Sequence, residues 1–327
     1  MPQPPRLHRR ALGTLGLAAL AGAGLGVHRL RSSYLADLQA ARARIAHGSR
    51  IVQTRSGPVE VGISAGSRPL LMIHGTGGGF DQGLHFAQRL TDAGWRVIAP
   101  SRFGYLRTPF PADASTDAQA DALADLLDAL GIHRLPVLGG SAGALPALAL
   151  ALRHPARCSA LVPIVPASYV PGRPATPAPA PWAEPAIASL LGSDFAFWCG
   201  ATLAPQVAVK ALLATDAAVV AAAAADEQAR VRRILWNILP VSARVQGLLN
   251  DAHLASRPTP MPFERITAPT LAVSVQDDRF GTYAAAQHLA ATVPGARLLS
   301  WPTGGHVWVG HDAELFAEVD AFLRTMP

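Results

Sequence analysis

Short apolar runs alternate with helical patterns along most of the chain, and this alternation limits the possible folds more than any other feature. The runs have the length and apolar character of buried strands. They are PLLMIHG (69–75), WRVIAP (95–100), LPVLGGS (135–141), ALVPIVP (160–166), APTLAVSVQ (268–276) and ARLLSW (296–301). Strands that alternate with helices form a parallel sheet covered on both faces. The sequence therefore predicts an α/β fold with a mostly parallel, doubly wound sheet.

The alternation stops for about a hundred residues between the runs at 160–166 and 268–276. A Pro-rich stretch at 170–185 is unsuited to a regular element, and an Ala-dominated helix is expected over 216–239. We therefore expect residues 168–263 to form a helical lid, inserted late in the sheet of a domain over 51–327. The aromatic side chains expected to form the apolar side of its pocket are Trp182, Phe195, Phe197, Trp198 and Trp236.

The N-terminal segment differs from the rest of the chain. Three arginines at positions 6, 9 and 10 precede an uncharged apolar run over 11–27, which is the layout of a signal peptide or a short membrane anchor. Residues 1–30 are therefore expected to be a signal peptide or a membrane anchor, with a soluble Ala/Gly-rich arm as a third possibility. Residues 31–50 are expected to form a linker helix. We expect membrane contact through this segment, in a protein anchored or exported at a bacterial cell envelope.

The net charge of the chain is carried by the same segment. Residues 1–55 hold nine arginines and one acid, a net +8, so that the remaining chain carries −2 of the total of +6. This distribution argues against a nucleic-acid footprint on the main domain.

Two Gly-x-Ser-x-Gly patterns occur, at 62–66 and 139–143, and their contexts differ. Ser64 lies between a predicted hairpin over 51–63 and a strand, so it is interpreted as a turn residue. Ser141 ends a buried run and begins a helical pattern, where a sharp strand-to-helix turn exposes a nucleophile and requires small flanking residues. The start of that helix also offers the Ala142 N–H to a developing oxyanion. The second pattern therefore predicts a nucleophilic serine.

A serine hydroxyl needs a base, and the base needs an acid that fixes its tautomer. His306 follows the last predicted strand in a Gly-Gly loop and is the expected base, whereas His311 directly precedes the last helix and suits a cap or surface role. Asp278 is the expected acid at the end of the run 268–276. Asp277 is the alternative, and whichever of the two is not the acid is expected to be solvated or to cap the next helix.

The glycine-rich text HGTGGG (74–79) after the first buried strand predicts a second oxyanion donor, from the Thr76 or the Gly77 amide. His74 is expected to hydrogen-bond this loop rather than to act as a base. The chain shows no metal-ligand spacing and no phosphate-binding Gly-Lys-Ser/Thr loop, so no cofactor and no metal is predicted.

Taken in order, the His-Gly loop at 74–79, the turn at 139–143, Asp278 and the His306 loop resemble the α/β-hydrolase fold family over residues 51–326. The resemblance implies a serine hydrolase acting on an ester-like bond, and the aromatic side chains of the lid favour a small-molecule substrate with a medium-sized, apolar acyl group. An acyltransferase or a C–C bond hydrolase uses the same triad, and a non-catalytic binding protein is the alternative from another class. The sequence departs from the family at Ser101, where many relatives carry an acid. The neighbouring Arg102 is interpreted as a solvated or phosphate-facing side chain, with a substrate carboxylate as the alternative partner.

Overall fold

A computed structural model gives the structure of the chain and describes residues 7–173 and 184–326. One eight-stranded sheet lies at its centre, in the order β1-β2-β4-β3-β5-β6-β7-β8. The first two strands form an antiparallel hairpin at one edge, and all pairs from β4–β3 to β7–β8 are parallel. The strands are β1 (Arg50–Thr54), β2 (Gly57–Ile63), β3 (Arg68–Ile73), β4 (Trp95–Pro100), β5 (Leu135–Gly140), β6 (Cys158–Ile164), β7 (Leu271–Val275) and β8 (Arg297–Trp301).

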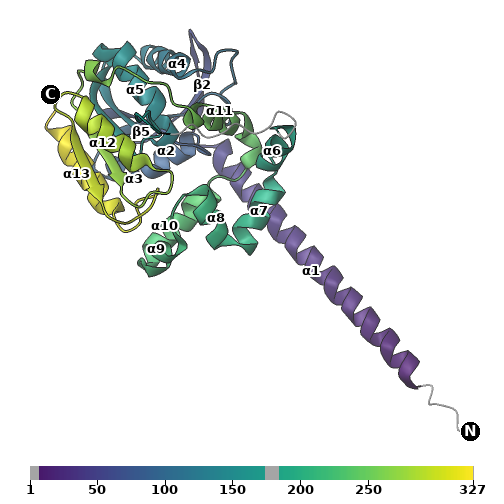
Figure 1. Cartoon of the computed structure of the whole chain (residues 1–327). Helices are drawn as coiled ribbons and strands as arrows, with labels where there is room; N and C mark the ends of the chain where they lie inside the picture. Colours follow the sequence, from purple (N-terminus) through teal and green to yellow (C-terminus); the bar gives the residue numbers. More distant parts are fainter. Residues whose placement is uncertain (1–6, 174–183, 327) are drawn as a thin grey trace, which may run out of the picture.

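Helices cover both faces of this sheet, which confirms the predicted fold class (Figure 1). One face packs against α4 (Thr116–Ala129), α5 (Ala144–Arg153) and α12 (Thr282–Thr292), and the other against α3 (Gln88–Asp92) and α13 (Asp312–Arg324). The short α2 (Phe80–Phe86) follows the loop after β3 and precedes α3. Both faces of the central strands are therefore buried, as their continuous apolar runs require.

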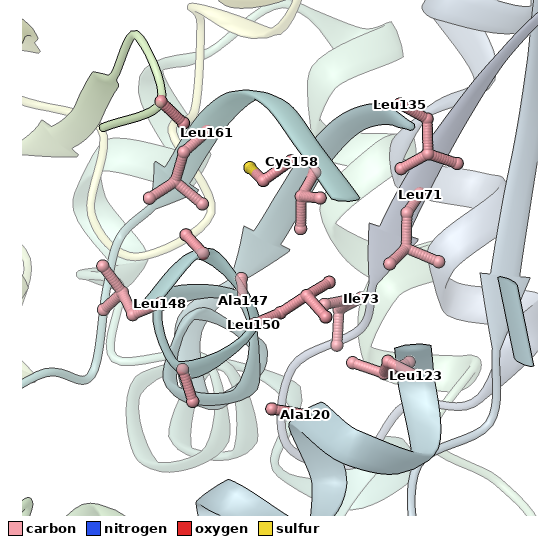
Figure 2. Packing of buried hydrophobic residues seen from close by; sticks show 14 of the residues in the cluster. Leu71, Ile73, Ala120, Leu123, Leu135, Ala147, Leu148, Leu150, Cys158 and Leu161 are labelled. Carbon is pink, nitrogen blue, oxygen red and sulfur yellow. The ribbon is translucent and has the colours of Figure 1, made fainter. Parts of the chain in front are cut away.

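The larger hydrophobic core lies between the sheet and the α4/α5 pair. Figure 2 shows Leu150 of α5 and Leu123 of α4 on either side of Ile73 of β3, in the same cluster as Leu71 and Leu148. The helix α5 is apolar on all sides, and its residues from Ala144 to Ala151 are buried. Such a helix holds its N-terminal end firmly against the sheet, and that end carries Ser141.

A helical insertion separates β6 from β7 where the sequence predicts an interruption. It comprises α6 (Glu184–Leu191), α7 (Asp194–Leu203), α8 (Pro205–Leu212), α9 (Ala217–Ala222), α10 (Ala225–Trp236) and α11 (Val245–Ser256). The single helix expected over 216–239 is wrong, because the chain is extended at Ala223 and Ala224. Asp216 caps α9 through its side chain, and the acidic Asp226 and Glu227 in the first turn of α10 favour a second helix start.

The helix α1 (Leu7–Ala46) is continuous across the predicted boundary at residue 30 and extends away from the domain (Figure 1). Its C-terminal part packs on the helical insertion, where Leu38 and Ala41 join Trp198 and Leu239 in a buried cluster. Within the portion of the chain that the structure describes, no single helix is long and apolar enough to cross a membrane. The helices α7 and α8 meet that criterion of length and composition only as a pair, bent by 117°.

Candidate active site

Ser141 lies at the sharp turn between β5 and α5, at the start of a 3₁₀ turn over Ser141–Gly143. Its φ of +51° is a strained left-handed conformation for a residue with a side chain. Two glycines make the turn possible: a Cβ on Gly139 would lie 2.5 Å from the Gly143 carbonyl oxygen, and a Cβ on Gly143 would lie 2.4 Å from the His74 carbonyl oxygen. At Gly139 the strand lies against the first turn of α5, and at Gly143 the turn lies against the end of β3, so no side chain fits at either position.

A chain of hydrogen bonds joins Ser141 to His306 and Asp278. The Ser141 Oγ lies 3.0 Å from His306 Nε2, and His306 Nδ1 lies 2.8 Å from Asp278 Oδ2. The Phe280 N–H donates to Asp278 Oδ1 at 2.9 Å, and the Thr282 hydroxyl donates to Oδ2. Although burial opposes ionisation, His306 and these two donors outweigh it and lower the pKa of Asp278. The carboxylate therefore stays charged and accepts a proton-bearing Nδ1, which leaves Nε2 free to accept from Ser141.

Asp277 has a different function from the one expected for the second acid. Its carboxylate accepts hydrogen bonds from the Gly305 N–H at 2.7 Å and the Gly304 N–H at 3.3 Å. The expectation that it is solvated or caps α12 is therefore wrong: it fastens the Gly-Gly loop that carries His306. His311 precedes α13 as its N-cap residue and stacks on Trp301, away from this chain of hydrogen bonds.

The loop after β3 places its amides beside Ser141, and most of them have partners inside the protein. The Gly75 N–H donates to Gln82 Oε1 at 3.0 Å, and the Gly77 N–H donates to the Tyr105 hydroxyl at 3.3 Å. The Thr76 N–H has no acceptor among the residues that the structure describes. Of the two candidates from sequence, Thr76 is thus the amide left for an oxyanion. Ala142 is the second residue of the 3₁₀ turn, where an N–H has no carbonyl partner within the turn.

A cavity of about 680 Å³ opens above Ser141 and is lined mainly by apolar side chains of the sheet edge and the helical insertion. Of the aromatic residues expected to line it, Phe197 does. The expectation is wrong for the others that the structure describes. Phe195 and Trp198 pack against Tyr34 of α1, and Trp236 packs against buried clusters of the helical insertion without lining the cavity. Trp182 lies outside the described residues.

Arg102 is not solvated, so that expectation is wrong as well. Its guanidinium is buried and forms a two-point ion pair with Asp251 of α11, at 2.6 and 2.5 Å. The buried His74 bonds this region as expected: Nδ1 lies 2.7 Å from the Gly75 carbonyl oxygen, and Nε2 accepts the Arg102 N–H at 2.9 Å. Burial first, and the Arg102 charge second, hold the pKa of His74 well below its ordinary value. His74 is therefore a neutral, structural side chain.

Ser101 is hydrogen-bonded to an acidic side chain, Glu60, which lies on a different strand. The Ser101 hydroxyl donates to Glu60 Oε2 at 2.9 Å and accepts the Phe80 N–H at 3.0 Å. Glu60, on β2, is fully buried and also accepts from Arg107. The pair Ser101–Glu60 thus anchors the start of α2 at the sheet edge.

Ser64, in the other Gly-x-Ser-x-Gly pattern, lies in a turn at the end of β2. Its hydroxyl accepts the Val97 N–H at 2.9 Å and donates to the Ala65 carbonyl at 2.9 Å. No part of the described chain brings a histidine to its hydroxyl.

Three residues of the site were missed from sequence: Phe280, Tyr105 and Asp251. Phe280 packs edge-on against the His306 ring, with 4.8 Å between ring centroids, and it lines the cavity. Because Phe280 lies two residues after Asp278, its sequence position could have indicated that it is close to the site. Tyr105 and Asp251 lie 146 positions apart in the chain, and no local pattern connects them.

Comparison with known proteins identifies the family of this fold. The family model for the alpha/beta hydrolase fold matches residues 68–309. The chain belongs to the alpha/beta hydrolase fold family. Among curated relatives, a 2-hydroxy-6-oxononadienedioate/2-hydroxy-6-oxononatrienedioate hydrolase of Pseudomonas putida is 34% identical over 127 residues, which is 36% of this chain and 44% of that protein. The match thus spans less than half the length of that relative.

Two solved structures show the extent of the fold similarity. An alpha/beta hydrolase fold protein from Nakamurella multipartita is 29% identical with a TM-score of 0.67, and the match covers 84% of this chain and 99% of that one. A bacterial membrane phospholipase A is 22% identical with a TM-score of 0.60, and the match covers 96% of this chain and 98% of that one. The second likeness concerns the fold alone, and it extends over more of this chain than the first. In the residues that the structure describes, no cluster of His, Cys, Asp or Glu side chains is arranged to hold a metal ion.

Proposed function

We propose that this alpha/beta hydrolase cleaves esters of apolar carboxylic acids through an acyl-enzyme on Ser141. The observation that carries the proposal is the hydrogen-bonded chain Ser141–His306–Asp278, which opens into an apolar cavity of about 680 Å³. A reactive group at the base of a mainly apolar cavity selects substrates whose acyl part gains from leaving water.

The geometry supports a two-step acyl transfer. His306 Nε2 takes the Ser141 proton as Oγ attacks the ester carbonyl, and it returns that proton to the leaving alcohol. Water, activated by the same nitrogen, then hydrolyses the acyl-enzyme. Asp278 accepts the hydrogen bond from the His306 Nδ1–H throughout, so the ring keeps the tautomer that the reaction needs. The Thr76 and Ala142 amides are assigned to the oxyanion, where one such donor contributes about 3 kcal/mol to the transition state.

C–C bond hydrolysis is the second candidate, because the Pseudomonas putida relative is named for a dienedioate substrate. Such a substrate carries two carboxylates, which need cationic partners when buried. Among the described residues that line the cavity, Arg173 is the one Lys or Arg side chain, and it also donates to the Phe280 carbonyl at 2.7 Å. The lining therefore favours a neutral acyl group over a dicarboxylate. An acyltransferase would use the same groups with an alcohol in place of water.

The first test is labelling of the full-length chain with a fluorophosphonate probe, followed by mass spectrometry of the modified peptide. We expect label on Ser141 that is lost in Ser141→Ala and retained in Ser64→Ala. The substrate class is tested with p-nitrophenyl acetate, butyrate and octanoate. Each buried methylene is worth up to about 0.8 kcal/mol, so kcat/KM is expected to rise up to about fourfold per methylene. A series with no preference beyond acetate contradicts the apolar acyl assignment.

We further propose that the helical insertion is a lid over the site and that the N-terminal segment attaches the protein to a membrane. In support, the insertion supplies much of the cavity lining, and the apolar run 11–27 lies on the same helix whose later turns pack on that insertion. The full chain is expected to stay with the membrane fraction after an alkaline wash and to be released by detergent. The variant Leu17→Arg places a charge within the apolar run and is expected to shift the protein to the soluble fraction. A parent chain that is already soluble contradicts the attachment.

A further inference from the structure

The amides of the loop after β3 are held by three separate acceptors. Gly75 N–H donates to Gln82, Gly77 N–H to the Tyr105 hydroxyl, and Gly78 N–H to the Gly75 carbonyl at 3.2 Å. Of these acceptors, Gln82 is on the helix directly after the loop and Gly75 is in the loop itself. Tyr105 is the acceptor that comes from a different part of the sheet edge, after β4. The position of the Gly77 peptide, and of the Thr76 amide next to it, thus depends on Tyr105.

Tyr105 itself is fully buried and fixed on both sides. Its ring lies edge-on to His74, with 4.6 Å between ring centroids. On the other side lies the start of α11, where a Cβ on Gly247 would lie 2.2 Å from the ring. The ring therefore has no room to move away from the loop, and the fit requires glycine at position 247.

The direction of the Tyr105 hydroxyl is set by Asp251 of the helical insertion. The hydroxyl donates its proton to Asp251 Oδ2 at 2.5 Å, so its lone pairs are free to accept the Gly77 N–H. Asp251 is held in turn by the two-point ion pair with Arg102. Arg102 also reaches the loop, since its Nε donates to the His74 carbonyl oxygen at 3.0 Å. Burial first, and Asp251 second, raise the pKa of Tyr105 well above its ordinary value, so the hydroxyl keeps the proton that it donates.

We propose that Tyr105 is a positioning residue for ester hydrolysis: it holds the Gly77 amide so that the Thr76 N–H remains the loop donor to the oxyanion, with Asp251 fixing its hydroxyl. The inference rests on the proposed function, because it concerns the oxyanion of that reaction. Asp251 comes from α11, so the helical insertion is part of the support for the catalytic loop as well as a wall of the cavity. A donor that is misplaced by a fraction of an ångström loses transition-state stabilisation while substrate binding in the apolar cavity is retained.

The test is Tyr105→Phe in the full-length chain, which keeps the ring and its packing and removes only the hydroxyl. We expect kcat for p-nitrophenyl butyrate to fall about tenfold or more, with KM within about twofold of the parent. The affinity of an alkyl boronic acid, which forms a tetrahedral adduct on Ser141, is expected to fall by the same factor as kcat. The matched control Tyr34→Phe removes a hydroxyl on α1, far from the loop, and is expected to leave all three values unchanged.

A second variant separates positioning from folding. Asp251→Asn keeps the size of the side chain, leaves Arg102 without its counter-charge, and is expected to lower both kcat and the unfolding midpoint. Tyr105→Phe is expected to lower kcat with a smaller fall in that midpoint than Asp251→Asn, because no buried ion pair is broken. A Tyr105→Phe protein with the parent's kcat and boronate affinity, or one whose loss lies entirely in KM, overturns the inference. A parent that neither hydrolyses the ester nor binds the boronate overturns the proposed function, and the inference with it.

Discussion

Replacing Gly143 by Ala tests the account of the turn that carries Ser141. Gly143 has φ −66° and ψ −16°, a conformation that alanine adopts without strain. If backbone freedom alone mattered, Gly143→Ala would stabilise the protein by about 0.4–1 kcal/mol, because it restricts the unfolded chain. The structure predicts the opposite sign, since the new Cβ would lie 2.4 Å from the His74 carbonyl oxygen and 2.5 Å from that of Ile73.

The size of the effect follows from these contacts. Moving the Cβ out to 3.0 Å requires a shift of at least 0.6 Å between the turn and β3. Overpacking of this kind costs about 1–3 kcal/mol. Because Ser141 and Ala142 belong to the same turn, the shift also misplaces the nucleophile and one oxyanion donor. A misplacement of about 1 Å costs about 100-fold in rate, so a loss of about tenfold or more in kcat is expected.

Urea unfolding and ester kinetics on Gly143→Ala, with Gly140→Ala as the matched control, provide the assay. Gly140 has φ −92° and ψ 131°, and a Cβ there would meet only the Met72 Cε at 3.7 Å. The control is therefore expected to unfold with a free energy equal to that of the parent or up to about 1 kcal/mol higher. A Gly143→Ala protein as stable as this control, or more stable than the parent, refutes the steric argument for the turn.

Three further outcomes follow from other contacts. Asp278→Asn leaves His306 without the carboxylate that fixes its tautomer, and kcat is expected to fall by about 10⁴ with KM retained; a loss below about tenfold contradicts the assigned role. His74 has a pKa well below 6.5 when folded, so below pH 6.5 the unfolded chain binds the extra proton and stability falls by up to about 1.4 kcal/mol per pH unit. Urea midpoints between neutral and mildly acidic pH check this, and an equal slope in His74→Gln argues against His74 as its source. Trp198→Phe removes the indole N–H that donates to Asp37 Oδ2 at 2.8 Å, and loss of this hydrogen bond is expected to weaken the docking of α1 by about 1 kcal/mol. Limited proteolysis of α1 should then become faster, and an unchanged rate speaks against that docking contact.

The fold was predictable because its information is local and periodic. The apolar runs are strands of a sheet buried on both faces, and each such strand shows this in its own residues. The distinction between Ser141 and Ser64 was predictable for the same reason, since a buried run before the serine and a helical pattern after it are both visible in the sequence. The preference for Asp278 over Asp277 agrees with the hydrogen bond to His306, although the two adjacent carboxylates look alike in sequence.

What could not be predicted depends on contacts between distant parts of the chain. Arg102 was interpreted as solvated or phosphate-facing, but its partner Asp251 lies 149 positions away and no local pattern connects the two. The aromatic residues of the helical insertion were assigned to the pocket because they lie in the predicted lid, and the sequence does not say what covers each of them. Phe195 and Trp198 instead pack against Tyr34 of α1. A composition-based pattern indicates that a side chain needs a partner, and only the tertiary structure identifies the partner.

Because α1 packs on the helical insertion, the stable domain begins within α1 and not at the first strand. Arg44 bonds the Asn237 and Leu239 carbonyl groups as well as Asp81, and Leu38 and Ala41 cover Trp198. A chain trimmed to begin at β1, where the sheet begins, would leave these groups facing water and would loosen the helices that border the cavity. For expression or fusion, the safe boundary of this hydrolase therefore lies within α1, before Tyr34, rather than at the edge of its sheet.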